Sequence, residues 1–185
     1  MVVQKLKLHE WFLVYQLDHI KKHAFHLPSV IQLDVTNYVD SFESQKKKVP
    51  INAILLKIIG DWAHQNPQAN KALFRTWGGN QFLMGDEIRI NFPIQIEQDN
   101  ALFTTAIVIK NPHLKTIEEL QGEIKSAKSK KLNSFPITQF IYSNPNIFIY
   151  RWLLKALHFS IYNFPKLYWK KGGGCISFSS LTNAS

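Results

Sequence analysis

The chain has 185 residues, 45% of them hydrophobic and 19% charged, and its 22 basic and 13 acidic side chains give a net charge of +9. This length suits one domain with its own core, and the composition excludes a largely disordered chain. A single cysteine excludes an internal disulfide framework, and the first residues lack the apolar run of a secretory signal, so we expect a cytoplasmic protein.

The positive charge predicts an anionic partner, namely nucleic acid, an anionic membrane surface or a phosphorylated small molecule, and composition does not choose among them. Of the three, nucleic acid is the least expected. Basic residues cluster at 46–48, 125–131 and 166–171 and do not form one stripe. Each cluster is also typical of a solvated helix end.

Residues 6–20 carry apolar side chains at helical spacing and are followed by two lysines, which favours a first amphipathic helix. Residues 26–35 alternate as a strand does. The sequence Asp34-Val35-Thr36 then leads into a short helix at 37–47, with Thr36 as the predicted N-cap.

Residues 51–64 are apolar on most of the helical circumference, which predicts a buried helix that ends at Asn66-Pro67. Four short runs are typical of strands, with turn residues at 78–80 and 98–100: 73–77, 81–84, 88–96 and 102–109. Thr116 and Glu119 have the spacing of a capping box at the start of a helix through about residue 130. This order predicts an α/β fold, a mixed sheet with helices packed on it.

The segment at about 133–171 is hydrophobic and basic, and residues 147–164 within it form a predicted helix. Charged and polar residues interrupt this helix too often for a transmembrane span. One interpretation is an interfacial helix that rests on an anionic membrane. The other is a lid or packing helix buried within the protein or its oligomer, in which replacement of Trp152 or Leu153 by alanine should lower stability.

The last segment combines a flexible glycine run at 172–174 with a predicted strand at 175–181 that carries hydroxyl side chains. An unpaired strand there would be an aggregation hazard. We therefore expect either that a neighbouring chain covers it or that the sequence is the front part of a longer protein.

Five segments, in chain order, carry a family resemblance: Asp34-Val35-Thr36; Val49-Pro50-Ile51-Asn52 with Lys57, Pro67 and Asn70; Leu102-Phe103-Thr104-Thr105 with Lys110-Asn111; residues 118–130; and Gly173-Gly174-Cys175 through Ser179-Ser180-Leu181. Together they resemble the catalytic domain of the 2-oxo acid dehydrogenase acyltransferases, a family that shares its fold with chloramphenicol acetyltransferase. The chain is most similar to the stand-alone bacterial type, because no lipoyl domain precedes the first helix.

The resemblance implies a two-layer, chloramphenicol acetyltransferase-like fold over residues 1–185 as a single domain, with an insert at about 133–171. It implies an acyltransferase that moves an acyl group between coenzyme A and an unknown acceptor. It also implies a homotrimer with active sites between subunits.

The resemblance assigns one catalytic residue. Ser179 matches the serine whose hydroxyl stabilises the oxyanion of the tetrahedral intermediate; the alternative is a strand serine that bonds only to backbone. The family's His-x-x-x-Asp motif is absent, since none of the seven histidines has an aspartate four residues later. We therefore expect a C-terminally incomplete domain that is inactive as a fragment.

Other chemistries have weaker sequence support. His19, His23 and His26 have no accompanying cysteine or carboxylate pattern, so no metal site is predicted. Cys175 has no evident base and is expected to be a buried thiol. Two alternatives to the enzyme stay open: a non-catalytic scaffold or regulatory homologue, and a basic protein that binds a membrane surface or nucleic acid.

Overall fold

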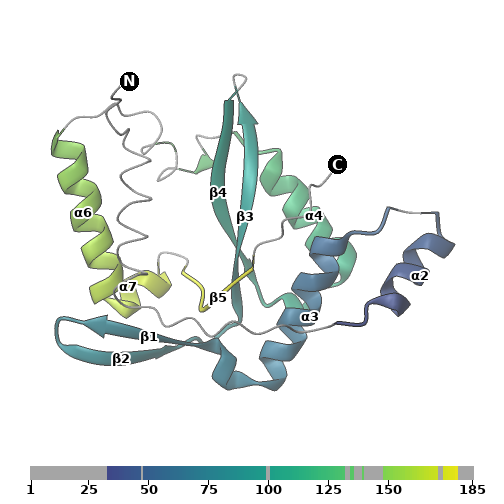
Figure 1. Ribbon diagram of the computed structural model, residues 1–185, viewed down its shortest axis with the longest axis horizontal. Helices are drawn as coiled ribbons and strands as arrows, with labels where there is room; N and C mark the ends of the chain where they lie inside the picture. The colour runs from purple at the N-terminus through teal and green to yellow at the C-terminus, as the bar shows by residue number, and fades with distance from the viewer. Residues whose placement is uncertain are drawn as a thin grey trace, which may run out of the picture.

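The computed structural model describes residues 33–46, 48–98, 101–131, 134–135, 139, 148–170 and 173–178 (Figure 1). The predicted helix at 6–20 and the predicted strand at 26–32 lie outside the described residues. Residues 33–35 are described and do not form a strand.

The helix predicted at 37–47 is present as α2, Thr36–Ser44, but its predicted cap is wrong. Val35 is the N-cap residue, and its side chain makes no capping hydrogen bond. Thr36 instead donates its backbone N–H to Asp34 Oδ1 at 3.0 Å. The Thr36 hydroxyl and backbone N–H hold the pKa of Asp34 below its usual value.

Helix α3, Ile51–Gln65, confirms the predicted apolar helix. Its inward face is fully buried at Ala53, Ile54 and Leu56, whereas Trp62 is 53% exposed. The helix is therefore covered on one face, not all round. The backbone N–H and the side-chain amide of Asn66 both donate to the Trp62 carbonyl, and the 3₁₀ turn η1, Pro67–Asn70, follows.

A hairpin of β1, Lys71–Thr76, and β2, Gly79–Met84, forms a two-stranded antiparallel sheet of its own. Gly79 has a φ of +109°, a conformation that favours glycine, and Thr76 Oγ1 donates to its carbonyl at 2.7 Å. The turn residues at 78–80 therefore predicted the position of the hairpin turn correctly.

The main sheet has the strand order β4-β3-β5. Strand β3, Arg89–Gln98, pairs antiparallel with β4, Ala101–Lys110, and parallel with the two-residue β5, Ile176–Ser177. The sheet is mixed, as predicted. Within the described part of the chain, however, the strands divide between two sheets instead of one.

The turn η2, Pro112–Leu114, leads from β4 to α4, Ile117–Lys128. Thr116 Oγ1 accepts from the Glu119 N–H at 3.2 Å, and Glu119 Oε2 accepts from the Thr116 N–H at 2.8 Å. The predicted capping box is confirmed.

Helices α3 and α4 lie on one side of β3 and β4 and enclose the main core with one face of that sheet (Figure 1). Alternate residues of β3 point into this core, as period-2 geometry requires. The core residues are Ala53, Leu56, Ala63, Ile88, Ile90, Phe92, Ile94, Ile96, Ile109, Leu120, Ile124 and Ala127.

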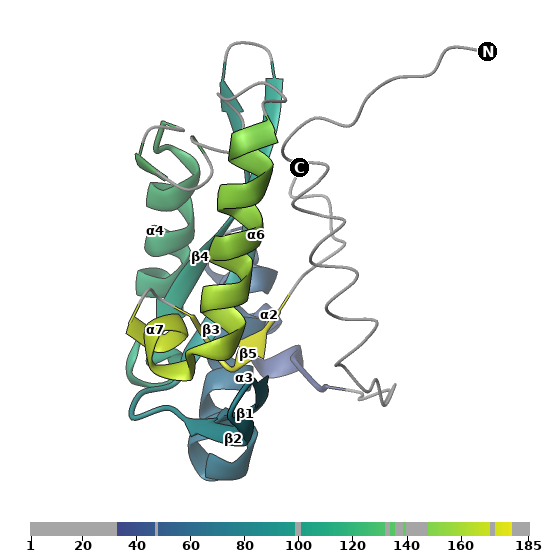
Figure 2. The ribbon, with the colours of Figure 1, turned by 90° about the vertical axis from the view of Figure 1, so that its left-hand side faces the viewer.

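Helix α6, Phe148–Asn163, confirms the helix predicted at 147–164, and α7, Pro165–Lys170, was not predicted. Both lie on the other side of the β3–β4 pair, where α6 packs on β1 (Figure 2). Within this chain Leu154 is the buried residue of α6, at 1% exposed, whereas Trp152 is 67% exposed and Leu153 53%, so neither of these two is a core residue of the single chain. Among the described helices, none is long and apolar enough to cross a membrane.

Candidate functional site

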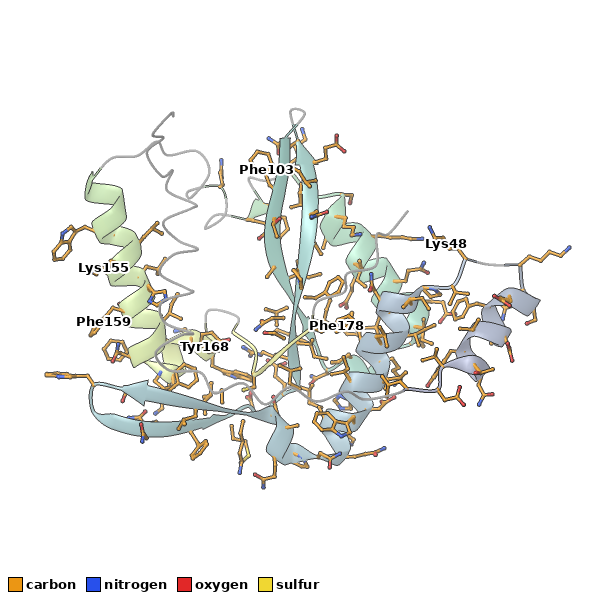
Figure 3. All side chains as sticks on the ribbon, viewed as in Figure 1. Lys48, Phe103, Lys155, Phe159, Tyr168 and Phe178 are labelled. Atoms are coloured by element: carbon orange, nitrogen blue, oxygen red, sulfur yellow. The ribbon has the colours of Figure 1, made fainter. Side chains whose placement is uncertain are left out.

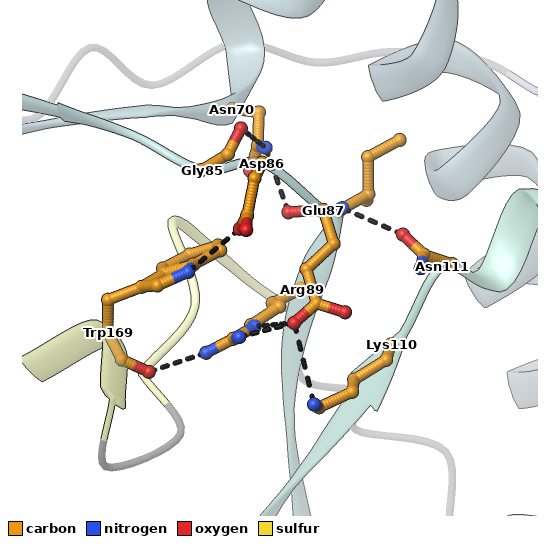
Figure 4. Close-up of polar contacts among 9 residues, drawn as sticks. Asn70, Gly85, Asp86, Glu87, Arg89, Lys110, Asn111 and Trp169 are labelled. Carbon is orange, nitrogen blue, oxygen red and sulfur yellow. Dashed lines mark hydrogen bonds and ion pairs between the residues drawn. The ribbon is translucent and has the colours of Figure 1, made fainter.

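A polar cluster joins the start of β3 to α7 (Figure 4). Arg89 is only 8% exposed, and its guanidinium lies 3.9 Å from the centre of the Trp169 ring. Arg89 Nη1 donates to the Trp169 carbonyl at 2.5 Å, and Nε donates to Glu87 Oε1 at 2.8 Å. Because the carboxylate of Glu87 also pairs with Arg89 Nη2 and with Lys110 at 3.4 Å, its pKa is lowered, chiefly by the hydrogen bond from Arg89.

Trp169 and Asn70 hold the loop between β2 and β3 from two sides. Trp169 Nε1 donates to Asp86 Oδ1 at 2.9 Å, and its ring occupies the space that any Cβ on Gly85 would need. Asn70 Nδ2 donates to the carbonyls of Gly85 at 3.2 Å and Glu87 at 3.0 Å. The loop therefore has little freedom, and glycine is required at position 85.

A glycine turn directs the chain from α7 into β5. Tyr168 Oη donates to the Gly174 carbonyl at 2.7 Å, and Asn91 Nδ2 donates to the same oxygen at 3.2 Å. A Cβ on Gly174 would lie 2.6 Å from the Arg89 carbonyl oxygen. The Phe178 N–H then donates to the Asn91 carbonyl at 3.0 Å, which holds β5 against β3.

The predicted oxyanion donor, Ser179, lies outside the described residues, which reach Phe178. Ser177, two positions earlier, is exposed, and its Oγ lies 3.5 Å from Asn91 Nδ2. The structure therefore describes the residues that precede the predicted catalytic position in sequence, but not Ser179 itself.

Cys175 was expected to be a buried thiol and is only partly buried. It is about half-buried, and this burial raises its pKa despite the opposing effects of a hydrogen bond with the Gly85 backbone and the charge of Arg89. At neutral pH the sulfur is therefore protonated, which supports the interpretation of Cys175 as a packed residue and not a nucleophile.

Two histidines that the sequence did not bring together stack at the end of α3. The rings of His64 and His113 are 4.4 Å apart and nearly parallel, at 13°. Burial lowers the pKa of His113, and a positive charge on His64 would lower it further. Lys57 Nζ, paired with Asp61 at 3.2 Å, donates to the His113 carbonyl at 2.5 Å.

The histidine pair borders a cavity of about 380 Å³ between α3, η1 and the loop before β3. His113 Nδ1 is buried and makes no hydrogen bond with the described residues, and the same holds for Asn70 Oδ1. Within the described ranges, no three His, Cys, Asp or Glu side chains are grouped as a metal site requires. The remaining metal candidates, His19, His23 and His26, lie outside those ranges.

Sequence analysis missed the Arg89–Trp169 contact and the histidine stack. One signal was present for the first: Arg89 is a charged residue at the start of a run whose alternate positions are apolar, so its charge needed a partner. Trp169 lies 80 residues away, and no spacing rule connects the two. For three residues that carry the resemblance, the structure adds a role: Lys57, Asn70 and Asn111 all bond to backbone groups near the ends of β3 and β4.

No protein-family model matches the chain, and no curated protein is significantly similar to it. A solved structure of the cubic core of the pyruvate dehydrogenase multienzyme complex aligns with it at 19% sequence identity and a TM-score of 0.47. The alignment covers 72% of this chain and 58% of that one, so the chain spans little more than half the length of that structure. What is established is a mixed α/β fold with small sheets.

Proposed function

We propose that the chain is a domain of the acyltransferase family, with a chloramphenicol acetyltransferase-like fold, that moves an acyl group between coenzyme A and a thiol or other acceptor. One observation carries the proposal: three separate segments of the resemblance converge at the start of β3. Asn70 bonds to the Glu87 carbonyl, Asn111 Oδ1 accepts from the Ile88 N–H at 3.0 Å, and Gly174 contacts the Arg89 backbone.

The proposed reaction is attack of an acceptor sulfur on the carbonyl carbon of the acyl thioester. The new C–S bond forms while the carbonyl oxygen becomes an oxyanion, and collapse of this intermediate breaks the C–S bond to coenzyme A. The proton of the attacking thiol ends on the departing sulfur. In this scheme Ser179 donates a hydrogen bond to the oxyanion, where charge develops in the transition state.

Coenzyme A enters the proposal as a substrate. The net charge of +9 would attract its phosphates, and no individual side chain is assigned to them. The proposal includes a homotrimer with active sites between subunits. Sedimentation equilibrium tests it directly: a trimer mass is expected, and a monomer mass at all concentrations would contradict it.

The test of the catalytic assignment is Ser179→Ala in a version of the protein extended through a His-x-x-x-Asp motif. Loss of one oxyanion donor typically lowers kcat by about 10²- to 10³-fold, with a much smaller change in KM. Ser177→Ala is the matched control because Ser177 carries an exposed hydroxyl two residues earlier in the sequence. Small and equal effects at both positions would make Ser179 a structural serine.

The 185-residue chain itself is expected to show no acyl transfer from acyl-coenzyme A to a dithiol, because its histidines lack the motif of the family's base. Saturable turnover by this chain would contradict that expectation. An extended version that folds, includes the motif and is still inactive would instead favour the non-catalytic scaffold.

A further inference from the structure

Charge is divided very unevenly along the chain. All 13 acidic residues lie at or before Glu123, and the residues up to that point include as many basic as acidic side chains. The whole net charge of +9 therefore belongs to residues 124–185. Its carriers are Lys125, Lys128, Lys130, Lys131, Arg151, Lys155, Lys166, Lys170 and Lys171. This last third of the chain has no carboxylate side chain of its own, and its part on α6 and α7, with Lys155 and Lys166, would attract an anionic partner.

Helix α6 presents an apolar face to solvent within this basic third of the chain. Trp152 and Phe159 are seven residues apart, which places them two turns apart on one face, and both are more than half exposed. Figure 3 shows Phe159 on the side of α6 away from β3 and β4. Lys155, also exposed, lies between them on the same face. Leu153 and Leu157 widen the exposed apolar surface.

The turn of the β1–β2 hairpin extends this surface. Trp77 is 94% exposed, and its backbone N–H donates to Asn163 Oδ1 at 2.8 Å, which fixes the turn at the C-terminal end of α6. A mostly apolar cavity of about 360 Å³ separates the two elements and includes Phe159, Phe164 and Lys166 in its lining. We call the exposed residues Trp77, Trp152, Phe159 and Phe164 the aromatic edge.

We propose that the aromatic edge docks on an anionic lipid bilayer, with α6 lying in the plane of the interface. Tryptophan favours the headgroup region of a membrane because its ring is apolar and its N–H is polar. Apolar side chains flanked by lysines bind anionic membranes through buried area and charge attraction together. Lys155 and Lys166 supply that charge beside the edge.

The charge and the side-chain chemistry favour a bilayer over two other occupants. A second copy would bring two basic, acid-free segments together, and these would repel each other. A nucleic acid would engage the lysines and stack on aromatic rings, but it offers nothing to Leu153 and Leu157. The inference is independent of the proposed acyl transfer, since it uses neither Ser179 nor coenzyme A.

The first test is flotation of the 185-residue chain with vesicles of phosphatidylcholine containing 30% phosphatidylserine, and with phosphatidylcholine alone. We expect binding to the anionic vesicles only, weakened by salt. In Lys155→Glu/Lys166→Glu, binding should fall by about 30-fold or more, since each lysine near an anionic surface contributes about a five-fold factor. The matched control, Lys125→Glu/Lys128→Glu on α4, makes the same charge change across the sheet and should lower binding by less than about three-fold.

The second test removes the rings without changing charge. Trp77→Ala/Trp152→Ala should weaken binding to the anionic vesicles by about ten-fold, because both rings are expected to enter the headgroup region. Trp62→Ala is the matched control, since Trp62 is exposed on α3 and outside the aromatic edge. All variants should melt at the temperature of the parent chain, because the altered side chains are exposed.

Several outcomes would overturn the proposal. These are absence of vesicle binding at low salt, equal losses in the edge variants and their controls, and self-association that depends on the two tryptophans and excludes vesicles. DNA or RNA that binds more tightly than vesicles and displaces them would show that the aromatic edge binds nucleic acid and not a membrane.

Discussion

Apolar side chains are buried to very different extents in two regions of this molecule. In the main core, which α3 and α4 enclose with β3 and β4, the inward-facing apolar side chains are buried, and Leu56 and Ile90 have no exposed surface. In α6 the pattern is just as apolar, yet Leu154 is 1% exposed while its neighbour Leu153 is 53% exposed. An apolar helical pattern therefore predicts a helix, but the number of elements that pack around it decides how much of it is covered.

The largest expected effect tests this contrast directly. Leu56→Ala should lower the free energy of unfolding by about 2–5 kcal/mol, because it empties a fully buried site between α3 and the sheet. Leu153→Ala, the same substitution at an exposed site, should change it by no more than about 0.5 kcal/mol. Urea denaturation followed by circular dichroism measures both.

The contrast between the two regions would be contradicted if Leu153→Ala lowered the free energy of unfolding as much as Leu56→Ala does. That result would mean that the exposed face of α6 is covered in solution, for instance by a second copy of the chain. Leu154→Ala sharpens the comparison within α6, since its cost should be closer to that of Leu56→Ala.

The next effect concerns the glycine turn that connects the α6–α7 region to the main sheet. Gly174→Ala should destabilise the protein by about 1–3 kcal/mol, because the new Cβ would lie 2.6 Å from a backbone oxygen that cannot easily move. Gly122→Ala is the matched control: nothing lies within 4 Å of a Cβ there, and the residue is inside α4. That control should stabilise the protein by about 0.5–1 kcal/mol. Equal and small changes in melting temperature would show that the turn adjusts freely.

Sequence predicted the elements of this fold better than their assembly. Helices α3, α4 and α6 and strands β1 to β4 all lie near their expected bounds, because their periodicity and turn residues are local signals. The division of the strands between two sheets is set by contacts between distant segments, for which the sequence has no local signal. Helix α7 was missed because its six residues are too few for a periodic pattern.

The same limit applies to the candidate site. Gly173 and Gly174 were recognised as a flexible turn, but the reason that position 174 needs glycine is the Arg89 carbonyl, 85 residues earlier. The pair of His64 and His113 depends in the same way on the packing of η2 against α3. Spacing rules find side chains that share one element, and these contacts join different elements.

The smallest expected effect separates two threonines that looked alike in sequence. Both were predicted to be helix N-caps, but only Thr116 is one, with a glutamate three residues later that returns the hydrogen bond. Thr116→Ala should therefore lower the free energy of unfolding by about 1 kcal/mol, because the Glu119 N–H loses its acceptor and with it one of the two hydrogen bonds of the capping box. Thr36→Ala should lower the free energy of unfolding by no more than about 0.5 kcal/mol, since its backbone N–H bond to Asp34 does not need the side chain and the hydroxyl contact with Asp34 that is lost is exposed to solvent. Thermal melts of both variants at neutral pH measure the difference, and an equal loss at the two positions would show that the Thr36 side chain caps α2 in solution after all.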